Sequence, residues 1–272
     1  MRILRCLTLN LWGAEPPLDQ RMALVAAGLR DLAPDVVALQ EVRETPSQLP
    51  NQAQTLAKAA GYHHVFAPAT PIGGGQEGLA ILAREPMAEH AVLTLPHAEL
   101  SERRVLLSAR LGDGPSAVWV HTTHLNYRLH HGKQREDQVQ TIADSLAQRV
   151  TDVPQILMGD FNARPESDEI RWLRGLVTLN GRRTYFQDAW DRTHPGEVGW
   201  TWTRANPYTA KYAFLEPDRR IDYIFATPMR GDGRATIHAC RIVLDQPGAD
   251  GVRASDHFGL LAEIQLDATG AA

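Results

Sequence analysis

The chain has 272 residues, of which 43% are hydrophobic, and its 28 basic and 32 acidic residues give a formal net charge of −4. This charge gives no general reason to expect nucleic-acid binding, and two cysteines, Cys6 and Cys240, exclude a disulfide framework. No linker, repeat or low-complexity block divides the sequence, so we predict one domain over residues 1–272. No segment resembles a signal peptide or a membrane span. We therefore expect a cytoplasmic monomer without membrane insertion.

Hydrophobic periodicity predicts that strands and helices follow one another along the chain. Apolar and alternating runs predict strands at residues 3–10, 35–41, 79–83, 87–95, 103–111, 117–124, 155–160, 219–225 and 259–266. Apolar stripes of helical period predict helices at residues 19–32, 49–60, 133–150 and 167–176. Asp19 is the expected cap of the first helix, and Gly61 is the expected end of the second. Residues 71–78 are rich in glycine but lack the Lys-Ser/Thr of a phosphate-binding loop, so we predict a mobile loop.

Polar side chains stand at the ends of several predicted strands. Four lie at the C-terminal end of a strand, namely Asn10, Glu41, His124 and Asp160, and three lie at the start of one, namely Asp222, Asp256 and His257. In an antiparallel or mixed sheet the start of one strand lies beside the end of its neighbour, so all seven can share one edge. Each has a plain alternative when it is taken singly. Glu41 can be a surface residue, and Asp160 with Asn162 can form an Asx turn. The joint pattern favours a shared site.

The residue types at this edge suit phosphoester chemistry with a hard cation. Mg²⁺ prefers oxygen ligands and leaves positions open for phosphate and water. The carboxylate of Asp160 can hold a metal or accept a proton from water, and the amide of Asn162 can donate to an oxyanion. His121 lies three residues before His124 and therefore falls on the opposite face of its strand. Even with the nearby His130 and His131, the spacing fits no tight zinc-ligand pattern.

Basic and aromatic residues suggest how a substrate is held. Arg103 shares the parity of a core-facing set of residues in its predicted strand, so it needs an anionic partner. A carboxylate in a structural ion pair and a bound phosphate are equally favoured as this partner. The irregular segment that includes Trp200 and Trp202 can form a pocket wall or can pack beneath long loops. We predict that Arg103, Arg219, Trp200 and Trp202 contact the substrate.

Six short motifs resemble those of the endonuclease/exonuclease/phosphatase, or DNase I-like, superfamily. They are Leu-Asn-Leu-Trp (9–12), Leu-Gln-Glu (39–41), Thr-His-Leu (123–125), Gly-Asp-Phe-Asn (159–162), Arg-Ile-Asp-Tyr-Ile (220–224) and Ser-Asp-His (255–257). They follow the family's order, and the resemblance runs from about residue 3 to residue 266. It implies an α/β fold, a four-layer sandwich of two mixed sheets packed face to face with helices outside. It also implies Mg²⁺-dependent hydrolysis of a phosphoester, with Mn²⁺ as a substitute.

The resemblance also implies roles for the residues that match the motifs. Glu41 becomes the principal metal ligand, supported by Asn10 and Asp256. Asp160 is implied to orient or deprotonate the attacking water, and Asn162 to donate to a phosphoryl oxygen.

The two histidines have roles that the resemblance leaves open. His257, held by Asp222, is implied to contact the phosphate or to act in proton transfer. His124 is implied to stabilise developing charge or to protonate the leaving group. Acids and bases that share one pocket cannot be assigned from their types alone.

Three functions remain in view from the sequence. We favour a phosphoesterase on a small or lipid-like substrate, because net negative charge and few lysines argue against tight duplex binding. Residues 135–138 also look more like the small-molecule and sphingomyelinase-like branch of the superfamily than the DNA-repair branch. A nuclease or abasic-site endonuclease on DNA or RNA is the first alternative. A non-catalytic interaction module is the second.

Overall fold

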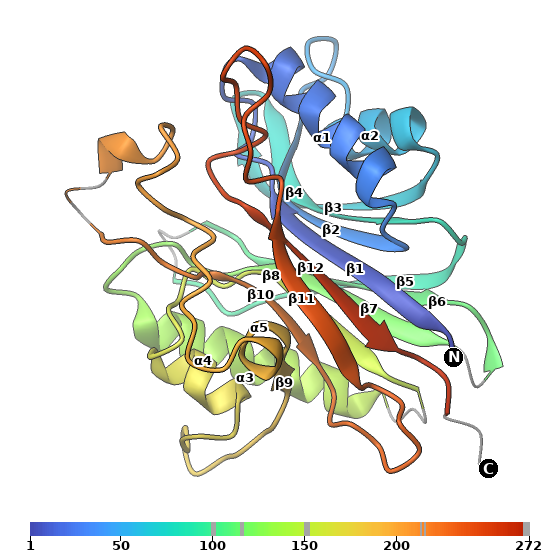
Figure 1. Cartoon of the computed structure of the whole chain (residues 1–272). Coiled ribbons are helices and arrows are strands. Elements are labelled where there is room, and N and C mark those ends of the chain that lie inside the picture. The colour runs from blue at the N-terminus through green and yellow to red at the C-terminus, as the bar shows by residue number, and fades with distance from the viewer. Residues whose placement is uncertain (99–101, 115–116, 150–152, 213, 215, 269–272) are drawn as a thin grey trace.

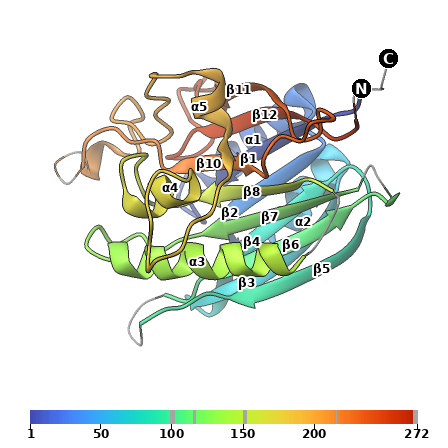
Figure 2. The same cartoon turned by 90° about the horizontal axis from the view of Figure 1, so that it is seen from below.

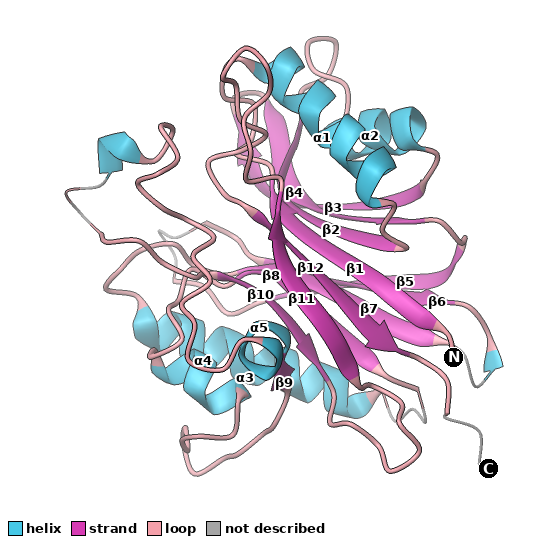
Figure 3. Ribbon diagram, viewed as in Figure 1, coloured by secondary structure: helices cyan, strands magenta, loops and turns pink. Residues whose placement is uncertain are grey.

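The computed structural model describes residues 1–98, 102–114, 117–149, 153–212, 214 and 216–268. Two mixed six-stranded sheets pack face to face, and helices cover their outer faces (Figures 1 and 3). The first sheet has the order β11 (Ile237–Val243), β12 (Gly259–Gln265), β1 (Ile3–Asn10), β2 (Val36–Glu44), β4 (Gly75–Ala83) and β3 (His63–Ile72). The second has the order β5 (Met87–Thr94), β6 (Val105–Leu111), β7 (Val118–His124), β8 (Gln155–Asp160), β10 (Asp222–Ala226) and β9 (Gln187–Asp188). The predicted four-layer α/β sandwich is confirmed.

The helices complete the outer layers. They are α1 (Leu18–Leu32), α2 (Gln52–Ala60), α3 (Gly132–Gln148), α4 (Asp168–Leu173), α5 (Ala189–Thr193) and the short 3₁₀ helix η2 (Ala210–Tyr212). Residues of α1 and α2 pack on the first sheet, and residues of α3 and α4 pack on the second. Figure 2 shows α3 lying across the second sheet. Among the described residues, no helix is long and apolar enough to cross a membrane.

The alternation of β1 explains why its last residue reaches the space between the sheets. Leu4 and Cys6 belong to the apolar core between the two sheets, whereas Leu7 and Leu9 belong to the core beneath the helices. Asn10 has the parity of Leu4 and Cys6, so it faces the other sheet. Because each buried aliphatic side chain contributes about 1.5–3 kcal/mol, a register slip that exchanged the two faces would be very costly.

Polar side chains replace the apolar core near the strand ends. The buried side-chain amide of Gln40 donates from Nε2 to Oγ1 of Thr122 in the other sheet at 3.0 Å. The same nitrogen lies 3.2 Å from Oγ1 of Thr8 in its own sheet. A buried amide is tolerated only when it is hydrogen-bonded, so these contacts fix how the two sheets meet at this end.

Three local predictions differ from the structure. The expected mobile loop at residues 71–78 is instead the turn of a β3–β4 hairpin, because Gly73 and Gly74 have φ of 54° and 81°, as a tight two-residue turn requires. Pro17, not Asp19, is the residue that precedes α1, and Asp19 lies in its first turn. Strand β2 continues past Glu41 to residue 44. The predicted last residue of α3, at position 150, lies outside the described residues.

Candidate active site

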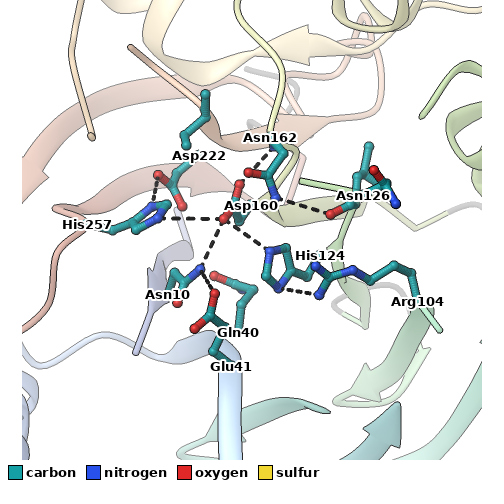
Figure 4. A network of polar contacts seen from close by, with 12 residues as sticks. Asn10, Gln40, Glu41, Arg104, His124, Asn126, Asp160, Asn162, Asp222 and His257 are labelled. Atoms are coloured by element: carbon teal, nitrogen blue, oxygen red, sulfur yellow. Dashed lines mark hydrogen bonds and ion pairs between the residues drawn. The ribbon is translucent and has the colours of Figure 1, made fainter. Parts of the chain in front are cut away.

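The seven polar residues predicted to share one edge lie together where one end of the first sheet faces the second, and Figure 4 labels all of them except Asp256, which lines the same cavity. Several of them line one cavity of about 570 Å³, namely Glu41, His124, Asp160, Asp256 and His257. We call this the rim cavity. Glu41 and His257, which come from opposite ends of the sequence, therefore face the same space.

Strand register explains why three of these residues meet. In the parallel pair β7–β8, His124 is the partner of Asp160, and in the antiparallel pair β8–β10, Asp160 lies opposite Asp222. Side chains of directly paired residues lie on the same face of a sheet. Gly159 has a φ of 143°, and a Cβ added there would lie 2.0 Å from the carbonyl oxygen of Thr123. Glycine is therefore required for β8 to approach β7 beside Asp160.

Asp160 lies at the centre of the hydrogen-bond network and is 1% exposed. Its Oδ2 accepts a hydrogen bond from Nδ2 of Asn10 at 3.0 Å and lies 3.3 Å from Nε2 of His124. Its Oδ1 accepts the backbone N–H of Asn162 at 2.8 Å. Burial raises the pKa of Asp160 to about 6, although the nearby charge of His257 opposes the rise. The carboxyl group therefore exchanges protons near neutral pH, as a general base for water must.

Asn162 is held in a left-handed conformation with a φ of 50°. Asparagine tolerates this region better than most residues because its short polar side chain bonds locally. Its Nδ2 donates to the backbone oxygen of Leu125 at 3.1 Å, and the side chain lines the rim cavity. The amide is thus fixed beside Asp160 at the cavity wall.

Glu41 reaches the site because its strand is irregular at this position. Regular alternation would place it with Val37 and Leu39 on the face that the helices cover. The pairing of β2 with β4 shifts between Leu39 and Val42, and Glu41 has a φ of 52°. This bulge turns the side chain toward the rim, where Oε1 accepts a hydrogen bond from Nδ2 of Asn10 at 3.1 Å.

Asp256 is positioned by the residues around it. The hydroxyl of Ser255 donates to the backbone oxygen of Asn10 at 2.6 Å, which ties this segment to the end of β1. The side-chain amide of Asn206 donates to the backbone oxygens of Ser255 and Asp256 at 2.8 and 3.0 Å. Asp256, whose Oδ1 also lies 3.3 Å from the hydroxyl of Ser255, is thereby held at the wall of the rim cavity.

At the acidic side chains of the rim cavity, burial outweighs the nearby positive charge of His257. Burial, with the carboxylates of Glu77 and Asp256, raises the pKa of Glu41 to about 7. Burial also raises the pKa of Asp256, as it does that of Asp160. A cation with oxygen ligands would relieve this excess of negative charge, and Glu41, Asn10 and Asp256 offer such ligands. The donor set fits a hard divalent ion.

A second cluster consists of Asp160, Asp222 and His257, whose ligand-type atoms lie within 4.8 Å of one another. Nδ1 of His257 lies 2.9 Å from Oδ2 of Asp222, and Nε2 lies 3.8 Å from Oδ2 of Asp160. Burial acts to lower the pKa of His257, but the carboxylates of Asp222, Asp256 and Asp160 outweigh it and raise this pKa to about 10. The imidazolium therefore fills the space between two carboxylates, and we interpret the cluster as a pair of ion pairs.

His124 contacts an arginine that the sequence analysis missed. Arg104 is 7% exposed, and its Nη1 lies 2.9 Å from Nδ1 of His124. Burial and the charge of Arg104 lower the pKa of His124 well below its ordinary value. Arg103, which we expected at the site, is exposed and does not line the rim cavity. Its predicted orientation was wrong because β6 begins only at Val105, so strand alternation does not extend back to Arg103.

The remaining predicted substrate residues lie in two places. Trp202 is buried and lines the rim cavity with Arg219, whose guanidinium carbon lies 4.4 Å from the centre of the Trp202 ring. Arg219 also lines a neighbouring cavity and so forms part of the wall between the two. Trp200 is 43% exposed and lies in that neighbouring cavity, outside the rim cavity.

Three further buried arginines have partners that the sequence analysis did not predict. The guanidinium of Arg21 donates to the backbone oxygens of Leu11, Trp12, Gly13, Glu15 and Ala254. Arg135 pairs with Glu169 at 2.5 Å, and Arg220 pairs with Asp188 at 2.9 Å. Because Arg21 binds the segments after β1 and before β12, it fixes the two loops that flank Asn10 and Asp256.

Comparison with known proteins agrees with this geometry. The profile of the Endonuclease/Exonuclease/phosphatase family matches residues 7–257. The chain is 28% identical to nocturnin from Drosophila melanogaster, over 91% of this chain and 42% of that protein. It is 26% identical to tyrosyl-DNA phosphodiesterase 2 from Rattus norvegicus, over 92% of this chain and 63% of that protein. It thus spans less than two thirds of either relative.

A solved structure is similar along the whole chain. An endonuclease/exonuclease/phosphatase from Beutenbergia cavernae superposes with a TM-score of 0.74 at 28% sequence identity, over 100% of this chain and 74% of that one. The resemblance seen in the six sequence motifs is therefore confirmed. The chain belongs to the endonuclease/exonuclease/phosphatase family.

Proposed function

We propose that the protein is a phosphoesterase that uses Mg²⁺, with Mn²⁺ as a substitute, to hydrolyse a phosphodiester or a phosphomonoester with water. One observation carries the proposal: Nδ2 of Asn10 donates to both Glu41 and Asp160, at 3.1 and 3.0 Å. A single amide thus holds an ion-binding carboxylate beside a water-activating one. Glu41, Asn10 and Asp256 would hold the ion, which supplies a Lewis acid for a phosphoryl oxygen when it is bound.

Asp160 is the group that orients the attacking water and accepts its proton. Its pKa of about 6 leaves most of the carboxyl ionised at neutral pH and still basic enough to take a proton. Hydrogen bonds from Asn10 and from the backbone of Asn162 fix the plane of the carboxylate. Preorganisation of this kind removes the entropic cost of placing the base at the moment of reaction.

Three side chains around Asp160 would contact the phosphoryl group of the substrate, namely those of His257, Asn162 and His124. His257, protonated at neutral pH and held by Asp222, places a positive charge near the phosphate. This favours contact with the phosphate over proton abstraction as its role, because an imidazolium has no free lone pair. Asn162 donates to a phosphoryl oxygen, and His124 stabilises developing charge.

The size and lining of the rim cavity support a small substrate. A cavity of about 570 Å³ is within the range that encloses a small organic ligand. Arg219 lines it, and its side chain lies against the ring of Trp202 without an ion-pair or hydrogen-bond partner among the described residues. A guanidinium that has no carboxylate partner can bind a substrate phosphate. We therefore keep a small or lipid-like phosphoester as the favoured substrate.

A nuclease is the second candidate, and one observation favours it. Arg128 and Lys211 line the rim cavity together with Arg219, so several basic residues face the space that a substrate would occupy. The name of the rat relative assigns it a phosphodiester in DNA. If nucleic acid is the substrate, its binding should weaken steeply as salt increases, because phosphate contacts release counterions.

The test is a panel of substrates with the metal ion varied. Bis(p-nitrophenyl) phosphate, its monoester, a lipid phosphodiester and abasic-site DNA are compared in Mg²⁺, in Mn²⁺ and in chelator. We expect metal-dependent cleavage of one of the first three, and selective cleavage of abasic DNA would favour the nuclease instead. Glu41→Gln should lower turnover by about 10³-fold, whereas Glu85→Gln, an exposed glutamate, should not change it. Full activity of Glu41→Gln would contradict the proposal, and inactivity toward the whole panel would favour a non-catalytic module.

A further inference from the structure

Arg104 is buried in a place where its charge has little direct compensation. It precedes β6, is 7% exposed, and lines the rim cavity. The nearest carboxylate oxygen is Oε1 of Glu102, which lies 3.6 Å from Nη2 and also accepts a hydrogen bond from Asn126. The shortest contact of the guanidinium is instead the 2.9 Å hydrogen bond between Nη1 and Nδ1 of His124. Figure 4 shows Arg104, His124 and Asp160 in line.

This contact determines which nitrogen of His124 carries a proton. A guanidinium is always charged in proteins and offers only donors, so the nitrogen that it meets must present a lone pair. Nδ1 of His124 is therefore unprotonated. The other nitrogen, Nε2, lies 3.3 Å from Oδ2 of Asp160, which is an acceptor when it is ionised. The contact with Arg104 requires a neutral imidazole with its hydrogen on Nε2, and the proximity of Nε2 to Asp160 is compatible with this form.

We propose that Arg104 is a positioning residue, which holds His124 as a neutral imidazole with its hydrogen on Nε2, beside Asp160 at the wall of the rim cavity, where it can donate to the reacting phosphoryl group. The inference rests on the proposed function and refines the two roles left open for His124. A neutral imidazole N–H is a very weak acid, so His124 donates a hydrogen bond and does not protonate the leaving group. The lowered pKa of His124, caused by burial and Arg104, agrees with this form of the ring.

A purely structural role for Arg104 predicts something different. If Arg104 served only to pair with Glu102, its loss would lower stability, and the protonation of the ring of His124 would not change. The two roles are separated by a measurement on the ring itself.

The first experiment is nitrogen NMR of the histidine rings in the metal-free full chain near neutral pH. The signals of His124 are assigned by their loss in His124→Gln. We expect an unprotonated Nδ1 and a protonated Nε2 in the wild type, and the other tautomer or a mixture in Arg104→Met. A wild-type ring with a protonated Nδ1 would overturn the inference. This readout needs no activity, so failure of the proposed function and failure of the inference can be told apart.

The second experiment compares the turnover of three variants on bis(p-nitrophenyl) phosphate with Mg²⁺. Arg104→Met should lower kcat by about 10²-fold with little change in KM, because a transition-state donor is misplaced. Arg104→Lys keeps a charged donor and should restore most of kcat together with the wild-type tautomer. Arg110→Met, a partly exposed arginine at the other end of β6, is the matched control and should keep full activity. Equal kcat in Arg104→Met and Arg104→Lys would also overturn the inference.

Discussion

Asn10 donates a hydrogen bond to Asp160 at 3.0 Å across the seam between the two sheets, although 150 positions separate the two residues. The same amide contacts Glu41, and its hydrogen bonds act to lower the pKa of both carboxyls. Asn10 thus favours the ionised form of both acids in a buried place where desolvation acts against their charge.

Replacing Asn10 with alanine should therefore shift the acid side of the pH–rate profile. Without the amide, the pKa of Asp160 rises above about 6, so activity should be lost at a higher pH as the solution is acidified. Turnover at neutral pH should fall by about 10²-fold. The measurement is kcat/KM across the pH range for Asn10→Ala, with exposed Asn180→Ala as the control. If Asn10→Ala lost activity on acidification at the same pH as the wild type, Asn10 would not control the pKa of Asp160.

The stability of the metal-free protein should fall as the pH rises. The pKa of His257 is about 10 in the folded state against an ordinary 6.5, so its stabilising contribution is complete below pH 6.5 and is lost as the pH rises toward 10. The pKa of Glu41 is about 7 against an ordinary 4.5, so the folded state binds this proton more tightly, and stability falls between those two values.

Urea unfolding in chelator, at a series of pH values from about 6.5 to about 9, measures this slope. Added Mg²⁺ should stabilise the protein more at the alkaline end, because the ion binds carboxylates only in their ionised form. An unfolding free energy that rises with pH in chelator would contradict the cited pKa shifts.

Glu41→Asn should stabilise the metal-free protein while it abolishes activity. The substitution removes one of several crowded buried carboxyls, and asparagine tolerates the φ of 52° better than glutamate does. We expect a gain of about 1 kcal/mol in the free energy of unfolding. Glu85→Asn, at an exposed position, should show no such gain. A destabilised Glu41→Asn protein would mean that the bulge is held by the glutamate itself.

Arg21→Met should loosen the loops on both sides of the site. Loss of the guanidinium leaves several buried carbonyl groups without donors, which should cost about 3 kcal/mol of stability. Arg30→Met, on the exposed side of the same helix, should cost little. Chemical denaturation gives both values, and turnover of the folded fraction of Arg21→Met should also fall. Equal stability of the two variants would rule out the role of Arg21 as a clamp.

The overall fold and the clustering of the site residues could be predicted from the sequence, because both depend on where the strands end. Register is set by which face of each strand is apolar, so polar residues at matched ends must gather at one rim. Asp160 and Asp222 are direct partners for this reason. The prediction of one domain over residues 1–272, and those of a monomer and a cytoplasmic location, stay predictions.

Features that depart from regular strand alternation could not be predicted from the sequence patterns. The orientation of Glu41 depends on a bulge that no periodicity reveals, and the place of Arg104 depends on where β6 begins. Arg21 did leave a signal, because it stands four residues before Val25 on the apolar stripe of α1. A charged residue at the end of an apolar stripe indicates a buried cation that needs several acceptors.

The joining of the two sheets by Asn10 also has a consequence for protein engineering. A break in the chain between β4 and β5 would leave Asn10 and Glu41 on one piece and Asp160, Asp222 and His257 on the other. Neither half would contain all the residues of the proposed catalytic set, so the proposed hydrolysis should return only when the halves reassociate with the native register. The protein therefore offers a natural division for a complementation assay, in which turnover reports that two polypeptides have come together.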